Sequence, residues 1–388
     1  MTEVRVNKRG ADRVRHGHLW IYRSDIVALD AKGGSVVSVK DERGNFVGQA
    51  LYSDLSQIAL RFLTQSAEEI DREWWRRRIR EATDRRQVPS ETNAYRLVYS
   101  EGDLLPSLIV DRYDDVLVLQ TLSQGSDALK PLLTEILIDE FKPRVIVERN
   151  DVRVRELEGL PLVAGALHGN APGELEILQH GLRFYVEPLG GQKTGSFLDQ
   201  RENRLAARAA AQTTRQQRAL DCFTFNGAFA LHLASVCESV IGIDISSEAV
   251  AASQRNAKLN GLTNVEFREA NVFDLLRELE SSGERFDVIV LDPPAFAKNR
   301  ASVKSALRGY KEINLRALKL LNPGGALITC TCSYHVSEDL FLEIVADAAI
   351  DAHRRLQIVE KRMQCSDHPV LVGMPETYYL KCVIARVI

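Results

Sequence analysis

The second half of the chain alternates regularly between apolar runs typical of strands and amphipathic runs typical of helices. Strands are expected at Ala219–Phe223, Val240–Asp244, Val265–Arg268, Val288–Asp292 and Ala326–Cys332, and helices at Ala228–Cys237, Glu248–Leu259, Lys304–Leu321 and Ser337–Ala349. This alternation requires parallel strands joined by crossover helices. We therefore expect an α/β domain with an open, doubly wound sheet, whose ligand lies beyond the carboxyl ends of the strands.

The remaining segments differ from this pattern. The last two apolar runs, Leu356–Lys361 and Tyr378–Ile384, have a loop but no helix between them, which predicts an antiparallel hairpin at one edge of the sheet. Short alternating runs near the N-terminus predict a small β-barrel or sandwich, and a helix followed by further strands opens a second block. We therefore divide the chain into a β domain at 1–70, a middle α+β domain at 71–186 and the doubly wound domain at 187–388.

Composition narrows the class of protein. The 388 residues include 45% hydrophobic ones and carry a net charge of -3, which excludes a disordered chain and a surface that is polycationic throughout. Any nucleic-acid site must therefore be local. The charged N-terminus does not resemble a secretory signal, and no apolar run approaches the roughly 18 residues of a membrane span, so we expect a cytoplasmic protein. Its six cysteines should stay reduced, and none has the spacing of a structural zinc site.

Residues at the ends of the first three predicted strands indicate a nucleoside site. A dinucleotide site needs several glycines, but the loop after Asp221 contains only Gly227, so a ligand without phosphates fits better. Asp244 would accept both hydroxyls of a ribose; alternatively, it only caps the next helix. Asn271 would place an amide oxygen against an adenine amino group.

The fourth and fifth strands end in Asp292-Pro293-Pro294 and in Cys332. The prolines fix φ and would hold the carboxylate at the sheet edge, although they are also compatible with a simple rigid turn. A cysteine in a strand is usually a small apolar residue. Because Cys332 is expected beside the strand that presents Asp292, a thiolate and a carboxylate would face one bound base.

A glycine-containing polar segment at 190–204 precedes the sheet. It would lay a loop and a helix N-terminus over the ligand, or it is a plain linker.

The first loop, Asp244, Asn271 and Asp292-Pro293-Pro294 resemble the ligand motifs of class I S-adenosylmethionine-dependent methyltransferases. With Gln192–Arg201 and Cys332-Ser333, nearly the whole chain resembles the single-cysteine 23S ribosomal RNA large-subunit cytosine-5 methyltransferases. Residues 17–22 and 48–53 are similar to that family's N-terminal PUA domain, an RNA-binding β-barrel. Residues 101–106, 108–113 and 367–370 are similar to its middle domain and C-terminal hairpin. Asn271 stands where the family usually has an acid, and Ala295 where the larger RNA cytosine-5 group has a second cysteine.

The resemblance implies a Rossmann-like methyltransferase sheet, S-adenosylmethionine as the cofactor, no metal, and 23S ribosomal RNA or a large-subunit assembly intermediate as the partner. Whether the chain is a monomer or a homodimer is open. Cys332 and Asp292 are the expected catalytic residues. The expected cofactor-binding residues are Lys193, Thr194, Phe197, Asp199, Arg201, Asp221, Phe223, Gly227, Asp244, Ile245, Asn271, Asp292 and Pro293. The expected RNA-binding residues are Lys8, Arg9, Arg13, Arg15, His18, Trp20 and Arg76.

Other interpretations remain at this stage. An Asp-Pro-Pro motif followed by an aromatic residue also suits a methyltransferase acting on a guanine or adenine nitrogen, which needs no thiolate. The chain could instead be a non-catalytic RNA-binding assembly factor. An NAD-dependent enzyme is disfavoured by the missing glycines. The arginine-rich stretch at 72–80 with Trp74 and Trp75 would contact phosphates and stack on bases, or it is a solvated helix face.

Overall fold

The computed structural model describes residues 2–191, 194–297 and 299–388. The chain forms two compact units, which we describe separately. Unit 1 comprises Met1–Ile177, Val186–Leu198 and Ser366–Thr377, and unit 2 comprises Leu178–Tyr185, Asp199–Cys365 and Tyr378–Ile388. No helix in the described part of the chain is long and apolar enough to cross a membrane.

Unit 1 begins with a β domain built around a six-stranded sheet of order β2-β6-β5-β4-β1-β3. Its elements are β1 (Glu3–Val6), α1 (Lys8–Arg15), β2 (Trp20–Tyr22), β3 (Ile26–Asp30), β4 (Val36–Asp41), β5 (Phe46–Tyr52) and β6 (Ile58–Thr64). Alternate apolar side chains of β1, β4 and β5 fill the core, as the period-two pattern predicts. Helix α1 was not expected, because its buried face consists of the small residues Gly10, Ala11 and Val14.

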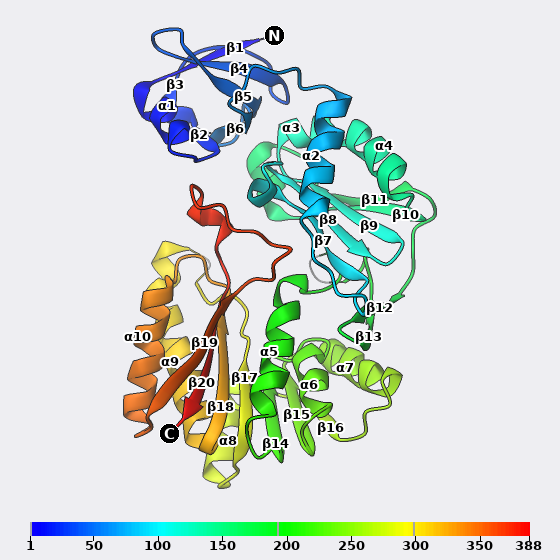
Figure 1. The fold of residues 1–388 in the computed structure, drawn as a ribbon. Helices are drawn as coiled ribbons and strands as arrows, with labels where there is room; N and C mark the ends of the chain where they lie inside the picture. The colour runs from blue at the N-terminus through cyan, green and yellow to red at the C-terminus, as the bar shows by residue number, and fades with distance from the viewer. Residues whose placement is uncertain (1, 192–193, 298) are drawn as a thin grey trace. The chain divides into compact units, whose positions relative to one another are not determined.

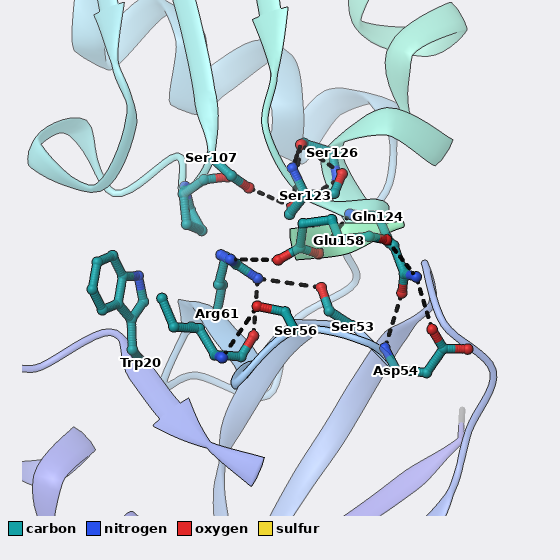
Figure 2. Close-up of polar contacts among 12 residues, drawn as sticks. Trp20, Ser53, Asp54, Ser56, Arg61, Ser107, Ser123, Gln124, Ser126 and Glu158 are labelled. Carbon is teal, nitrogen blue, oxygen red and sulfur yellow. Dashed lines mark hydrogen bonds and ion pairs between the residues drawn. The ribbon is translucent and has the colours of Figure 1, made fainter. Parts of the chain in front are cut away.

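The second part of unit 1 packs helices on a five-stranded sheet of order β11-β10-β9-β8-β7. Its elements are α2 (Arg72–Asp84), β7 (Ala94–Tyr99), β8 (Leu108–Tyr113), β9 (Val116–Thr121), α3 (Gln124–Ala128), α4 (Lys130–Phe141), β10 (Val145–Asn150) and β11 (Val163–His168). The strands β12 (Leu175–Gln179) and β13 (Leu182–Val186) form a separate two-stranded sheet. Polar contacts between β6, the 3₁₀ turn at Arg153–Glu158 and α3 join the β domain to this sheet within unit 1 (Figure 2).

Unit 2 contains the doubly wound sheet, with strand order β16-β15-β14-β17-β18-β20-β19. Its elements are α5 (Arg201–Ala211), β14 (Arg218–Cys222), α6 (Ala228–Ala234), β15 (Ser239–Asp244), α7 (Ser247–Leu259), β16 (Val265–Glu269), α8 (Val272–Ser281), β17 (Phe286–Leu291), α9 (Val303–Leu320), β18 (Leu321–Thr331), α10 (Glu338–Asp351), β19 (Leu356–Met363) and β20 (Lys381–Val387). Strands β14 to β18 are parallel, and β20 is antiparallel to both of its neighbours. The predicted α/β architecture with an antiparallel hairpin at one edge is therefore confirmed.

Two groups of helices cover this sheet, with α9 and α10 in one group and α5 and α6 in the other (Figure 1). The chain order reverses between β14 and β17, so the carboxyl ends of these strands form the crevice where ligands bind in such sheets. Helix α8 was missed, because the residues around Asn271 were interpreted as a ligand loop. Asn271 is its N-cap, with the side-chain oxygen accepting a hydrogen bond from the Phe273 backbone.

Candidate active site

Cys332 and Asp292 follow adjacent parallel strands at one sheet edge. Leu291, the last residue of β17, pairs with Thr329 of β18, which continues to Thr331, so both strands end at the same edge of the sheet. The Cys332 sulfur lies 3.9 Å from the backbone carbonyl oxygen of Pro293, directly after Asp292. Cys332 is partly exposed, whereas the other five cysteines are buried. It is therefore the cysteine best placed to meet a substrate.

A chain of side-chain hydrogen bonds orients Asp292. The Gln200 amide nitrogen donates to Asp292 Oδ1 at 2.7 Å, and the Gln200 oxygen accepts from Asn203 at 2.6 Å. The oxygen of Asn203 accepts in turn from Arg362 at 2.8 Å. Because each amide has its donor and acceptor ends engaged, this chain fixes which end of Gln200 faces the carboxylate. Gln200 lies inside the segment that the sequence indicated, but its role as the partner of Asp292 was not foreseen.

A second network fixes the turn that carries Cys332. The Ser333 hydroxyl is 2.9 Å from the Tyr310 hydroxyl and accepts from the backbone of Ala297 at 3.1 Å. Thr331 donates to the same Tyr310 oxygen at 2.8 Å. Ala297 belongs to the loop after β17, so Ser333 ties the two loops together. Burial raises the pKa of Tyr310, which keeps the phenol neutral and able to share these bonds.

The loop after β14 holds a buried carboxylate. Asp221 Oδ2 accepts from the Thr224 hydroxyl at 2.6 Å and from the Ala230 backbone at 2.9 Å. Its Oδ1 has no hydrogen-bond partner among the described residues. Burial raises the pKa of Asp221 to about 7, with Asp292 adding in the same direction. Such an unsatisfied buried acceptor is suited to a ligand that brings a donor or a positive charge.

The same loop has a strained backbone. Phe223 and Phe225 adopt positive φ angles of 66° and 50°, and Gly227 adopts 83°. The left-handed conformation costs free energy for a side-chain-bearing residue and is concentrated at functional sites. The absence of a Cβ at Gly227 also matters, because an added Cβ would lie only 3.1 Å from the Phe267 ring.

Asp244 lies at the end of β15 as predicted. Its Oδ2 accepts from the Phe225 backbone and its Oδ1 from the Ser246 backbone, both at 3.0 Å. The alternative that Asp244 caps α7 is wrong, because the Ser246 side chain is the cap. Each carboxylate oxygen can accept a further bond, as a ribose would require. Ile245 beside it is 69% exposed, an apolar surface next to a polar site.

The other expected cofactor residues are divided between the units. Thr194 donates to Asp111 at 2.6 Å in unit 1, where Phe197 also lies, and Asp199 accepts from Tyr379 at 2.6 Å in unit 2, where Arg201 is buried. Lys193 lies outside the described residues. The assignment of these residues to the cofactor therefore remains a prediction, as do those of Phe223, Asn271 and Pro293.

The expected RNA-binding side chains of unit 1 have internal partners. Arg9 and Arg13 bond to the buried Asp25 at 2.7 and 3.2 Å, and Arg15 bonds to Asp41 at 2.9 Å. His18 is 3.3 Å from Glu376, and the Trp20 indole donates to Glu101 at 2.9 Å. Arg9 nevertheless remains 65% exposed, and Lys8 is exposed.

The arginine-rich face of α2 forms ion pairs within unit 1. Arg76 contacts Glu73, Asp139 and Glu140. Trp74 and Trp75 are only 2% and 1% exposed. The interpretation that these two rings stack on RNA bases is therefore wrong, because they belong to the core between α2 and the sheet.

Comparison with known proteins agrees with this geometry. Residues 4–65 match a PUA-like domain and residues 213–368 a methyltransferase domain. A ribosomal RNA large subunit methyltransferase I from Shewanella amazonensis is 42% identical over 380 residues, which cover 95% of each chain. The chain belongs to the ribosomal RNA large subunit methyltransferase I family. A second member, from Tolumonas auensis, is 41% identical over 398 residues and covers 100% of both chains.

Two solved structures share the fold of this chain. A crystal structure of SMU.776 complexed with SAH is 20% identical, covers 100% of both chains and has a TM-score of 0.85. The structure of the SAM-dependent methyltransferase from Agrobacterium tumefaciens is 14% identical, covers 78% of this chain and 91% of its own, and has a TM-score of 0.54. The methyltransferase match and the family identify S-adenosylmethionine as the cofactor. The unsatisfied oxygen of Asp221 and the two oxygens of Asp244 fit a ligand that carries an ammonium group and ribose hydroxyls.

The raised pKa of Asp221 predicts a pH dependence of stability. The folded protein keeps this proton up to a pH of about 7, whereas the unfolded chain loses it near the ordinary pKa of about 3.9. The folded state thus binds more protons in this window, so the contribution of Asp221 falls as the pH rises from about 4 to 7. We expect Asp221→Asn to be more stable than the parent by on the order of 2 kcal/mol at pH 8, with little difference at pH 4. Urea unfolding of the ligand-free proteins across this range measures the effect, and parallel profiles would contradict it.

Proposed function

We propose that this chain methylates C5 of a cytosine in large-subunit (23S) ribosomal RNA, with Cys332 as the nucleophile and Asp292 as the polar partner of the base. The observation that carries the proposal is the placement of these two residues. The partly exposed Cys332 sulfur lies 3.9 Å from the carbonyl oxygen of Pro293, and Pro293 directly follows Asp292, whose carboxylate is oriented by Gln200. A base-nitrogen methyltransferase would have no use for a sulfur at this position.

The chemistry follows from the electronics of cytosine. S-adenosylmethionine supplies an electrophilic methyl group on a sulfonium centre. C5 is a poor nucleophile, and the Cys332 thiolate corrects this by adding to C6, which places electron density on C5. C5 would then bond to the methyl carbon as the bond from that carbon to the sulfonium sulfur breaks, leaving a neutral thioether. Loss of the C5 proton to solvent would restore the ring as the C6–S bond breaks, returning the thiolate. Cys332 is thus regenerated in each turnover.

Asp292 would stabilise the covalent adduct through the N3/N4 edge of the base. Its orientation by Gln200 is important, because a hydrogen bond to the base depends on where the carboxylate points.

Two findings support ribosomal RNA as the substrate. The relatives named above are ribosomal RNA large subunit methyltransferases over their full length, and the N-terminal match is to a PUA-like domain. Within that domain, we assign phosphate contacts to the exposed Lys8 and Arg9 on α1. Both free 23S ribosomal RNA and a large-subunit assembly intermediate are compatible with this assignment, as are a monomer and a homodimer.

Analysis of the product nucleoside tests the proposal. Ribosomal RNA from a strain lacking the gene is incubated with the protein and labelled S-adenosylmethionine, digested to nucleosides and separated by mass. We expect the label in 5-methylcytidine. Label in a methylated guanosine or adenosine would establish the base-nitrogen alternative, and RNA binding without cofactor binding would establish the non-catalytic one.

A further inference from the structure

Three exposed cations follow the loop after β17 in unit 2. Arg300 lies in the 3₁₀ turn at Arg300–Ser302, and Lys304 and Arg308 lie in the first two turns of α9. All three residues are exposed. The four-residue spacing places Lys304 and Arg308 on one face of the helix, and Arg300 comes four residues before them. We call these three residues the basic stripe.

The basic stripe has no anionic partners in the part of the chain that the structure describes. None of its three side chains forms an ion pair or a hydrogen bond with a described residue. The sequence gives one reason, because no aspartate or glutamate occurs between Asp292 and Glu312. Like charges four residues apart slightly disfavour a helix, so these cations do not stabilise the element that carries them.

The cations in the rest of α9 are paired. Lys311 lies 2.9 Å from Asp351, and Lys319 lies 2.9 Å from Glu280, which Arg316 also contacts. Among the described residues, the unpaired cations of this helix are therefore confined to its first two turns. A helix face that is merely solvated gives no reason for such a division.

The basic stripe lies near the candidate catalytic residues. The start of α9 follows the loop that begins at Asp292, at the same end of unit 2 as the ends of β17 and β18 (Figure 1). Phe296 of this loop packs with its ring 4.8 Å from the ring of Tyr310, two residues after the last cation of the stripe. The Tyr310 hydroxyl is 2.9 Å from the hydroxyl of Ser333, the residue after Cys332. An RNA whose base reaches this edge must bring its flanking phosphates past the surrounding elements, and the start of α9 is one of them.

Exposed, unpaired cations are suited to the phosphates of RNA. Lys and Arg side chains neutralise phosphates and release the counterions that surround the strand. A cation that is already held by a carboxylate must first break that ion pair. Arg13 and Arg76 of unit 1 are held in this way by Asp25 and Glu140, whereas the basic stripe is not.

We propose that the basic stripe binds phosphates of the ribosomal RNA strand next to the target base. The inference rests on the proposed function only in that ribosomal RNA is the substrate. It depends neither on Cys332 as the nucleophile nor on cytosine as the methylated base.

Two triple variants of the full-length protein test the stripe. The first replaces its three cations: Arg300→Gln, Lys304→Gln and Arg308→Gln. The control removes the same charge from the paired part of the same helix: Lys311→Gln, Arg316→Gln and Lys319→Gln. Filter binding to 23S ribosomal RNA from a strain lacking the gene gives the affinity of each protein between about 50 and 200 mM salt.

We expect the stripe variant to bind this RNA on the order of tenfold more weakly than the parent. The slope of log affinity against log salt concentration should become shallower by about 2, because each phosphate contact with a single strand contributes about 0.7. The control variant should keep a slope close to that of the parent. Methyl transfer at saturating RNA should stay within a few-fold of the parent for both variants, because neither set of side chains contacts the reacting atoms.

Two results would overturn the inference. One is a stripe variant that matches the parent in affinity and salt slope, which would leave the stripe to an acidic protein surface. The other is an equal loss of affinity in both triple variants, which would show an effect of net charge rather than of a site. The stripe side chains have no contacts to lose, so urea unfolding of that variant should follow the parent curve. Failure of the proposed chemistry would appear separately, as a product other than 5-methylcytidine, and would not change the binding measurements.

Discussion

Replacing Cys332 with alanine is expected to lower methyl transfer to ribosomal RNA by on the order of 10³-fold or more while leaving the affinity for S-adenosylmethionine within about twofold of the parent. The reason is that the proposed mechanism uses the sulfur to activate C5 of the base, whereas the expected cofactor residues Asp221 and Asp244 lie on other strands. Cys332 is partly exposed, so truncating its side chain should cost little stability. Single-turnover methylation and calorimetric titration with the cofactor measure the two effects.

Cys237→Ala provides the matched control. Cys237 is buried, lies beyond the end of α6 and contacts neither catalytic residue, so any loss of activity there would report a packing defect. Its transfer rate is expected to remain within a few-fold of the parent rate. Robust methylation by Cys332→Ala would remove the covalent mechanism and leave the base-nitrogen alternative as the better explanation.

The doubly wound sheet could be predicted because its signal is local and repeated. Each buried strand is a continuous apolar run, and each helix carries its own apolar face, so the strand-ending residues Asp244, Asp292 and Cys332 were placed at the sheet edge from sequence alone. The boundaries differ by one to a few residues. Strand β17 ends at Leu291 because Pro293 and Pro294 cannot donate ladder hydrogen bonds.

What the sequence did not reveal depends on long-range partners. Gln200 orients a carboxylate 92 residues away, and nothing near it in the sequence signals that role. Trp74 and Trp75 were misinterpreted for a related reason: the arginines around them suggested an RNA surface, but the helix turns those charges outward and buries both rings.

Removal of Arg61 is expected to produce a large loss of stability in unit 1. This side chain is 6% exposed and pairs at 2.7 Å with Glu158, which is 1% exposed (Figure 2). Arg61 also donates to the Ser53 hydroxyl and the Ile58 carbonyl oxygen, so it joins β6 of the β domain to the 3₁₀ turn that carries Glu158. Arg61→Met would leave a buried carboxylate without its cation, and we expect the free energy of unfolding to fall by about 3 to 5 kcal/mol. Urea unfolding followed by circular dichroism measures this loss.

The double variant Arg61→Met with Glu158→Gln separates the pair from its surroundings. It removes the unpaired negative charge of Glu158 while keeping a side-chain oxygen that can accept from the Gln124 backbone N–H, which donates to Glu158 at 3.2 Å in the parent. Most of the lost stability should therefore return, because the penalty comes chiefly from the unpaired buried carboxylate. Arg72→Met is the exposed control, since Arg72 and its partner Glu135 are 37% and 63% exposed and such pairs contribute less than about 1 kcal/mol. If Arg61→Met costs no more than Arg72→Met, the β domain is held to the rest of unit 1 by apolar packing rather than by this ion pair.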